Sequence, residues 1–185
     1  MLAKSLVLCY TKLMKFDYKA FYEKNVAFYN ARPLAKRALP LLNQMLSWFF
    51  VAAYALLWVY ALFIKKFGVK DQLCILFVPA LGLLIVSVLR LAIEKPRPYD
   101  EDGDNITPLV KKKNANKKSF PSRHIACAML ISMTFMAYSL GIGIPLFLFA
   151  LALAYIRFAL GLHYPSDLIA GGAVGILVGL LAFFL

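Results

Sequence analysis

The chain has 185 residues, of which 62% are hydrophobic, and carries a formal net charge of +12. Because the apolar share of a soluble domain is usually about half, this composition excludes a soluble globular protein and indicates one compact helical membrane domain, residues 1–185. The positive charge is compatible with nucleic acid, anionic headgroups or a phosphate-bearing substrate, but the long apolar runs favour lipid over nucleic acid. The bilayer and a lipid phosphate are the expected partners.

Residues 1–40 alternate aromatic and basic side chains, and their charges are too frequent for a buried span. The pattern predicts an amphipathic helix in the membrane interface, with lysines toward the headgroups and aromatic rings toward the acyl chains. The positions include Lys12, Lys15, Phe16, Tyr18, Lys19, Phe21, Tyr22, Lys24, Phe28 and Tyr29. Pro33 and Pro40 are expected to break this segment before the transmembrane core, residues 41–185.

The core contains apolar runs of roughly the length that a bilayer requires, about 20 residues. They predict five transmembrane helices at about 42–64, 73–89, 122–140, 144–160 and 165–184. The expected fold class is therefore an all-α membrane protein, with an interfacial amphipathic helix followed by a bundle of about five spans. A glycine-rich turn is expected at 141–145. The glycines at 171, 172, 175 and 179 predict a close helix-packing face on the last helix.

The only long polar connection, residues 99–120, has an acidic block followed by a basic one. The acidic block is loosely similar to a calcium-binding loop, but its glycine comes one residue early and Lys111 occupies the position of the closing glutamate. A solvated, mobile loop is the expectation. The cysteines, Cys9, Cys74 and Cys127, are scattered and predict neither a disulfide framework nor a metal site, and no cofactor is expected.

Four polar clusters each adjoin the end of an apolar run, and the only two histidines of the chain lie in them. The clusters are Arg90 with Arg97-Pro98, Pro121-Ser122-Arg123-His124, Arg157, and His163-Tyr164-Pro165-Ser166-Asp167. If each span crosses the membrane once, all four clusters emerge on the same face. The sequence therefore predicts one polar site at one membrane face.

The residue types of this site point to chemistry on an anion. Arginines near the hydrocarbon can together neutralise a phosphate, although any one of them alone would more often be an interface anchor. Ser122 begins a predicted helix, where its hydroxyl either binds phosphate oxygens or is a plain N-cap. His163 and Asp167 are four residues apart, so that the carboxylate can orient the imidazole and leave one ring nitrogen as a nucleophile.

These clusters resemble, in order and spacing, the signature of the type 2 phosphatidic acid phosphatase superfamily of membrane lipid phosphatases and haloperoxidases. The family pattern is Lys-x6-Arg-Pro, Pro-Ser-Gly-His and Ser-Arg-x5-His-x3-Asp. The chain has Arg90-x6-Arg97-Pro98, Pro121-Ser122-Arg123-His124 and Arg157-x5-His163-x3-Asp167. It departs from the pattern at Arg90 in place of lysine, at Arg123 in place of glycine and at Ile156 in place of serine.

The resemblance implies a role for each matched residue. His163 would attack phosphorus to form a phosphohistidine, Asp167 would orient His163, and His124 would protonate the departing oxygen. Arg90, Arg97, Ser122, Arg157 and the backbone of Arg123 would hold the phosphoryl oxygens, and no metal would be required. Small bacterial members of similar layout are undecaprenyl diphosphate phosphatases. A phosphatase of phosphatidic acid or phosphatidylglycerol phosphate, or a non-catalytic lipid-phosphate binder or transporter, is the alternative.

The expected location is the cell membrane, and two arguments about the orientation of the site disagree. The catalytic side carries 18 of the 21 lysines and arginines, which under the positive-inside rule places the site in the cytoplasm. The family resemblance implies an extracytoplasmic site, and this is the orientation that we expect. The generic apolar residues of the spans specify neither the lipid nor the oligomeric state.

Overall fold

A computed structural model of the chain describes residues 18–64, 68–100, 103–104, 106–110 and 118–185. Within these ranges every regular element is a helix, which confirms the expected all-α membrane fold. The helices are α2 (Tyr18–Asn30), α3 (Pro33–Val59), the π-helical turn η1 (Tyr60–Ile64), α4 (Val69–Ala92), α5 (Arg123–Tyr138), α6 (Leu140–Ala159), α7 (Pro165–Gly179) and the 3-10 turn η2 (Leu180–Phe183). The expectations for residues 12, 15 and 16, for residues 101 and 102 of the acidic block and for residues 111–117 of the basic block lie outside the described ranges.

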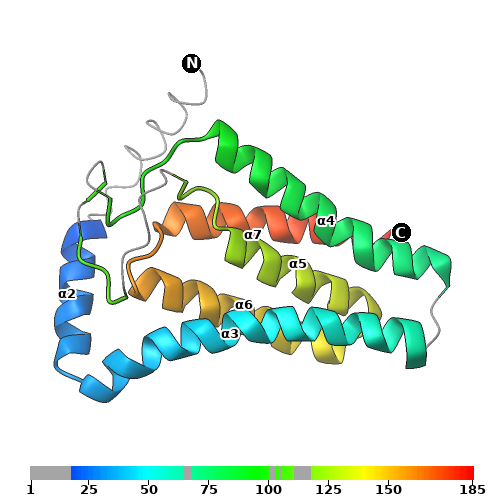
Figure 1. The fold of residues 1–185 in the computed structure, drawn as a ribbon, viewed down its shortest axis with the longest axis horizontal. Coiled ribbons are helices and arrows are strands. Elements are labelled where there is room, and N and C mark those ends of the chain that lie inside the picture. The colour runs from blue at the N-terminus through cyan, green and yellow to red at the C-terminus, as the bar shows by residue number, and fades with distance from the viewer. Residues whose placement is uncertain (1–17, 65–67, 101–102, 105, 111–117) are drawn as a thin grey trace.

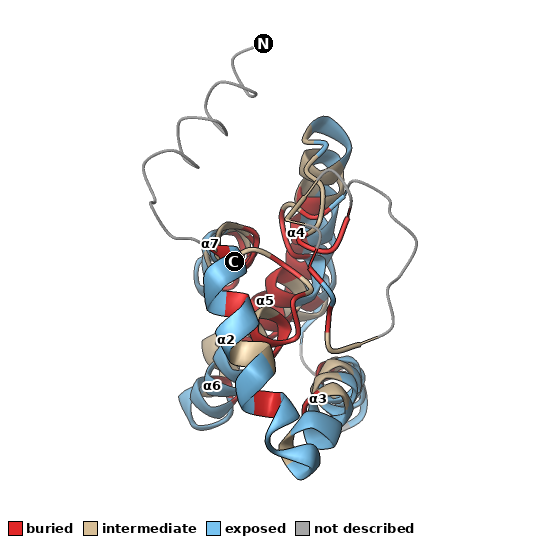
Figure 2. Ribbon diagram, turned by 90° about the vertical axis from the view of Figure 1, so that its left-hand side faces the viewer, coloured by how far each residue is buried: buried red, intermediate tan, exposed pale blue. Residues whose placement is uncertain are grey.

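Helix α5 is the centre of the bundle, and the other long helices surround it (Figures 1 and 2). It packs most closely on α6 and α7 and contributes Ile125, Met129 and Ile131 to the largest apolar core, where they meet Phe50 of α3 and Leu153 of α6. Helix α2 runs across the end of the bundle at which α4 and α6 end and α5 and α7 begin (Figure 1). Its interfacial location stays a prediction.

In the part of the chain that the structure describes, four helices, at 33–63, 69–92, 140–159 and 165–183, are long and apolar enough to cross a membrane. Their outer faces expose large apolar side chains such as Trp48, Phe77 and Leu148, which in water would form an oversized hydrophobic surface. These side chains are suited to contact with lipid. The remaining expected span, at 122–140, corresponds to α5. This helix is shorter, at 16 residues, and is largely enclosed by its neighbours.

Two predicted breaks were wrong. Pro40 lies inside α3, which already begins at Pro33. A proline deprives the carbonyl four residues earlier of its helical partner, and here that residue, Lys36, is exposed. The expected turn at 141–145 belongs to the first turns of α6, and the connection from α5 is Ser139 alone. Gly143 instead allows close packing, because an added Cβ would lie 2.4 Å from the Cα atom of Met136.

The close packing face predicted on the last helix is confirmed at Gly171, Gly175 and Gly179, which lie against residues of α5 and the residue before it, and is wrong at Gly172. A Cβ atom added at Gly171 would lie 2.5 Å from the carbonyl oxygen of Ser122, and one added at Gly175 would lie 2.7 Å from that of Ala126. Gly172, on another side of α7, has only an ordinary contact of 3.9 Å with Ile125. The absence of side chains at Gly171 and Gly175 therefore brings the first turns of α7 against the start of α5.

Candidate active site

All four polar clusters of the sequence lie at one end of the bundle (Figure 1). Arg90 is in the last turn of α4, and Arg157 is in the last turn of α6. Ser122 precedes the first residue of α5, while His163 and Asp167 stand just before and within the first turn of α7. The alternation of the spans thus brings together residues that are far apart in the sequence.

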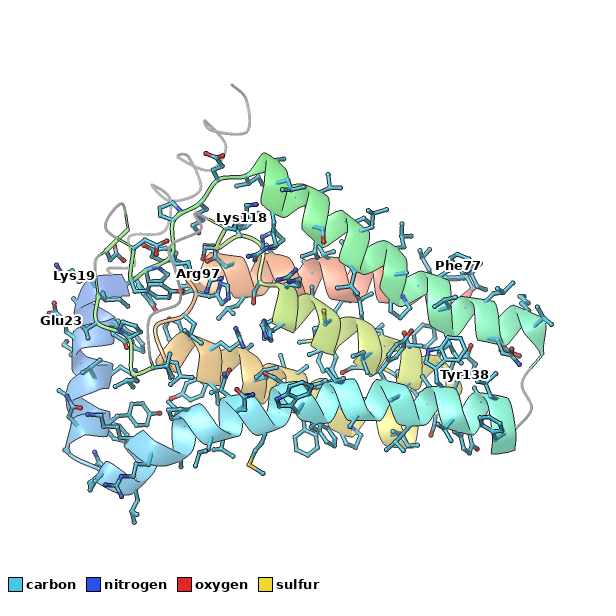
Figure 3. The ribbon with its side chains drawn as sticks, viewed as in Figure 1. Lys19, Glu23, Phe77, Arg97, Lys118 and Tyr138 are labelled. Atoms are coloured by element: carbon cyan, nitrogen blue, oxygen red, sulfur yellow. The ribbon has the colours of Figure 1, made fainter. Side chains whose placement is uncertain are left out.

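Figure 3 shows this polar end directly. Arg97 and Lys118 lie there, at the same end as Lys19 of α2, whereas Phe77 and Tyr138 lie toward the opposite end. The segments that follow α4 and precede α5 run side by side, because Lys95 and Lys118 form an isolated parallel β-bridge. The bridge holds the segment after α4 and the segment before α5 together beside the site.

Asp167 is fully buried and is the most extensively hydrogen-bonded side chain of the site. Its Oδ2 atom accepts hydrogen bonds from the Ser119 hydroxyl and, at 3.1 Å, from the backbone N–H of Tyr164. Its Oδ1 atom lies 2.7 Å from the Nζ atom of Lys95. Its backbone carbonyl accepts the N–H of Ser122 at 2.9 Å. The carboxylate is therefore fixed by three segments of the chain.

The His163 ring is buried beside this carboxylate, with Nδ1 3.6 Å from Oδ2 of Asp167 and 3.4 Å from Oγ of Ser119. Because the single hydroxyl hydrogen of Ser119 is donated to Asp167, its oxygen can only accept a hydrogen from Nδ1. This arrangement selects the tautomer with a proton on Nδ1 and a lone pair on Nε2.

Burial is the main cause that lowers the pKa of His163, and together with the nearby charges of Arg157 and Arg97, against the opposing effect of Asp167, it brings this pKa to about 4. Because this pKa lies well below neutrality, the imidazole is uncharged at pH 7. A neutral ring with a lone pair on Nε2 is suited to nucleophilic attack.

Three buried polar atoms of the predicted phosphate-binding residues have no hydrogen-bond partner within the described part of the chain: Nε of Arg97, Nε of Arg157 and Oγ of Ser122. The remaining contacts orient the two guanidinium groups, since Arg97 donates to Tyr99 at 2.9 Å and Arg157 donates to Asn43 at 3.1 Å. A buried unpaired polar group costs about 1–3 kcal/mol. The cluster is therefore suited to an anion with several acceptor oxygens.

Arg90 bonds to the protein backbone in this structure, and its phosphate-binding role stays a prediction. Its guanidinium donates to the carbonyl oxygen of Pro121 at 2.8 Å and also to that of Lys118. A planar guanidinium can bond two separate carbonyls at once, which a single ammonium does less well. In this structure Arg90 supports the segment that leads into α5, while its charge lies near those of Arg97 and Arg123.

Arg123 and His124, the first two residues of α5, are exposed and border a cavity of about 300 Å³ between α3, α5 and α6. The rest of the cavity is mostly apolar and includes Phe50, Ile131 and Leu153. These two side chains thus stand between the buried cluster around Ser122 and an apolar space. Among the described residues, no three His, Cys, Asp or Glu side chains are close enough to hold a metal ion.

The sequence reasoning missed Lys95, Ser119 and Asn43 as members of the site. Lys95 lies within the Arg90-x6-Arg97 spacing and Ser119 lies just before Pro121, so proximity to the motifs was the available signal. Asn43 is an amide in an apolar span, where a polar side chain usually has a specific partner. That partner is Arg157.

The fold and the site define an integral membrane protein, an α-helical bundle with a buried histidine–aspartate pair and a cluster of arginines at one end. Residues 71–185 match the PAP2 superfamily, and the chain belongs to that superfamily. This confirms the resemblance inferred from the three motifs.

The chain is similar in sequence to two further proteins and in structure to one solved protein. It is 33% identical over 102 residues to undecaprenyl-diphosphatase BcrC of Bacillus subtilis, a match that covers 55% of this chain and 51% of that protein. It is 30% identical over 133 residues to lipid A 4'-phosphatase of Bacteroides thetaiotaomicron, covering 66% and 58%. The chain thus spans little more than half the length of these relatives.

The crystal structure of a transmembrane PAP2-type phosphatidylglycerolphosphate phosphatase from Bacillus subtilis has the same fold, with a TM-score of 0.66. It is 22% identical, and the match covers 95% of this chain and 89% of that one.

Proposed function

We propose that this protein is a metal-independent lipid phosphatase that hydrolyses a polyprenyl diphosphate, of the undecaprenyl type, through a phosphohistidine intermediate. The observation that carries the proposal is the set of unpaired buried atoms on Arg97, Arg157 and Ser122 around the neutral ring of His163. Membership of the PAP2 superfamily and the similarity to an undecaprenyl-diphosphatase support it.

In the first step, Nε2 of His163 attacks the terminal phosphorus and the bond to the bridging oxygen breaks. The lipid monophosphate departs, and His124 donates the proton that its oxygen requires. The guanidinium groups of Arg97 and Arg157, with the Ser122 hydroxyl, stabilise the charge on the transferred phosphoryl oxygens. Because Nδ1 of His163 already directs its proton toward Ser119 and Asp167, the positive charge that develops on the ring is compensated.

In the second step, a water molecule attacks the phosphohistidine and gives its proton to His124. Inorganic phosphate leaves, and the ring of His163 returns to its neutral form. The exposed position of His124 at the border of the apolar cavity suits a residue that exchanges protons with both the lipid product and water. The cavity between α3, α5 and α6 would hold the first part of the prenyl chain.

The test uses purified protein in detergent with undecaprenyl diphosphate and excess EDTA. Release of inorganic phosphate is expected, and His163→Ala should reduce kcat by at least about 1,000-fold. A substrate labelled with ³²P in the terminal phosphate should give an acid-labile, alkali-stable label on the protein. That label should be absent in His163→Ala, and His124→Ala should slow both its formation and its hydrolysis.

Undiminished turnover by His163→Ala would contradict the mechanism. Tight binding of the substrate without release of phosphate would instead support a lipid-phosphate binder. A parallel panel with phosphatidic acid, phosphatidylglycerol phosphate and undecaprenyl monophosphate tests the substrate class, and faster turnover of either glycerolipid would contradict the diphosphate proposal.

A further inference from the structure

Lys95 makes the shortest contact of a charged side chain with the aspartate of the proposed active site. Its Nζ atom lies 2.7 Å from Oδ1 of Asp167 and 2.7 Å from the hydroxyl oxygen of Ser166. The Lys95 side chain is 13% exposed and that of Asp167 is 0% exposed. The ion pair is therefore shielded from water. Charges in such a buried site interact much more strongly than charges on the protein surface.

The position of Lys95 is determined by the fold. Its backbone carbonyl accepts the N–H of Ser119 at 2.9 Å, next to the β-bridge with Lys118. Its ammonium also lies 4.7 Å from the ring centre of Tyr164 and 5.7 Å from that of Phe120, distances that favour cation–π attraction. The same pairing of segments thus delivers both Lys95 and Ser119 to Asp167.

A buried carboxylate attracts a proton or a cation, because its charge is poorly solvated. Two groups beside Asp167 can compensate its charge: the Lys95 ammonium at 2.7 Å and, if protonated, the His163 ring at 3.6 Å. These groups compete. While Lys95 is paired, the carboxylate can orient His163 without making protonation of the ring favourable.

We propose that Lys95 is a positioning residue of the active site, the permanent counter-ion of Asp167 that keeps His163 neutral and available for attack. The proposal rests on the proposed function in one respect, namely that His163 is the nucleophile. It assigns to Lys95 a role that the matched motifs do not contain, since they specify only the first and last residues of the Arg90-x6-Arg97 spacing.

Other charged or titratable groups face the pair from every surrounding element. They are Arg90 of α4, Arg97 of the following segment, Arg157 of α6, Tyr164 before α7 and Tyr18 of α2. Burial raises the pKa of both Tyr18 and Tyr164, so that neither phenol carries charge near neutral pH. The three arginines are unchanged in every Lys95 variant and therefore form a constant background. Removing Lys95 is therefore the change that unbalances Asp167 most directly.

The first experiment measures the pKa of His163 by ¹⁵N NMR in detergent micelles. In a His124→Gln background with a histidine-free tag, His163 is the only imidazole, since the chain has two histidines. Lys95→Met and Lys95→Gln are each expected to raise the pKa of His163 by about 1–3 units. Lys95→Arg should restore the parent value. Lys118→Met, which removes an exposed charge from the adjacent segment, is the matched control and should not change it.

The second experiment follows kcat/KM against pH with undecaprenyl diphosphate and His124 present. The acid limb should move to higher pH in Lys95→Met and Lys95→Gln by the shift seen in NMR, and remain in place in Lys95→Arg and Lys118→Met. An unchanged His163 pKa in folded Lys95→Met or Lys95→Gln would overturn the proposal. So would unfolding of both neutral variants while Lys95→Arg stays folded, because Lys95 would then be purely structural. A parent protein without phosphatase activity would contradict the proposed function, whereas the NMR measurement would still test Lys95.

Discussion

At the scale of single residues, the site is defined by polar groups that the fold buries without completing their hydrogen bonds. Arg157 is 6% exposed and Ser122 is fully buried, yet Nε of the first and Oγ of the second have no partner among the described residues. Native proteins tolerate few such groups, and those that persist often have a function. A phosphoryl group would satisfy them together, which is why we assign the site to phosphate chemistry.

Arg123 allows a test of the preference for a diphosphate. Its side chain is exposed at the polar border of the apolar cavity, where the lipid-side phosphate of a diphosphate would lie in the proposed binding mode. Because a hydrogen bond to a charged group contributes about 1.5–3 kcal/mol, Arg123→Gly should lower kcat/KM for undecaprenyl diphosphate by about 10-fold or more. The loss for a lipid monophosphate should be much smaller.

Arg123→Lys is the matched control, since it keeps the charge and should retain most of the activity on the diphosphate. Kinetic constants for both lipids, measured side by side in the same detergent, provide the comparison. Equal losses on the diphosphate and the monophosphate in Arg123→Gly would contradict a contact with the second phosphate group.

The sequence predicted that the four polar clusters lie at one end of the bundle, but not which contacts their side chains make. Arg90 and Arg157 both stand at basic positions of the family pattern, yet Arg90 bonds two backbone carbonyls whereas Arg157 keeps a nitrogen without a partner among the described residues. The motif spacing identifies the residue at each position of the family pattern. The direction of its side chain depends on neighbours from other helices, such as Asn43. Lys95 and Ser119 could not be assigned for the same reason, because the β-bridge that brings them to Asp167 joins separate segments.

At the scale of helices, apolar run length predicted the elements well and their ends poorly. Pro40 and the glycines near 141–145 resemble breaks when only local propensity is considered. In the bundle, α3 continues through Pro40, and Gly143 lies within α6, where it packs closely against Met136 of α5. Helix ends in this chain are therefore set by packing between helices, which a single sequence does not display. The glycine face of α7 was predictable because its spacing is itself a packing pattern.

The α5–α7 contact leads to a stability prediction with an internal control. Gly171→Ala would place a methyl group 2.5 Å from the carbonyl oxygen of Ser122, so that α7 must move away from α5. Overpacking of this kind costs about 1–3 kcal/mol. It should also separate Asp167 from Ser122, whose backbone atoms are hydrogen-bonded at 2.9 Å. Both the thermal unfolding midpoint in detergent and kcat should decrease.

Gly172→Ala is the matched control on the adjacent position of the same helix. The added methyl group would be 3.9 Å from Ile125, an ordinary contact, and alanine favours a helix over glycine. Its midpoint should equal or exceed that of the parent protein. A Gly171→Ala protein as stable and active as Gly172→Ala would show that α7 does not depend on this close approach.

At the scale of the whole molecule, helix α2, which lies across one end of the long-helix bundle, is attached to segments beside the site. The hydroxyl of Tyr22 on α2 contacts the carbonyl oxygens of Thr107 and Leu160 at 3.2 and 3.3 Å, and accepts the N–H of Leu109 at 3.1 Å. Tyr18 packs its ring 5.2 Å from that of Tyr164, whose backbone N–H binds Asp167. Helix α2 thus connects the polar loop, the end of α6 and the segment before α7.

Because the site lies at one end of the bundle, two engineered thiols, one at each end, can show which side of the membrane the site occupies. Lys118 is exposed at the catalytic end, and Lys70 is exposed at the other, next to the connection between α3 and α4. In a background without Cys9, Cys74 and Cys127, each position is replaced by cysteine and intact cells are treated with a membrane-impermeant maleimide. Retained phosphatase activity shows that each variant is folded.

We expect Lys118→Cys to be labelled in intact cells and Lys70→Cys to be labelled only after the membrane is opened. The reason is functional: a carrier lipid diphosphate released outside the cytoplasm can be hydrolysed there only by an extracytoplasmic site. The opposing argument is electrostatic, because the sequence predicts that 18 of the 21 basic residues lie on the catalytic side. Five of them are in or beside the site, where the proposed anionic substrate would account for their charge: Arg90, Lys95, Arg97, Arg123 and Arg157. Labelling of Lys70→Cys with protection of Lys118→Cys would show that the remaining basic residues decide the topology and that the substrate is hydrolysed on the cytoplasmic side.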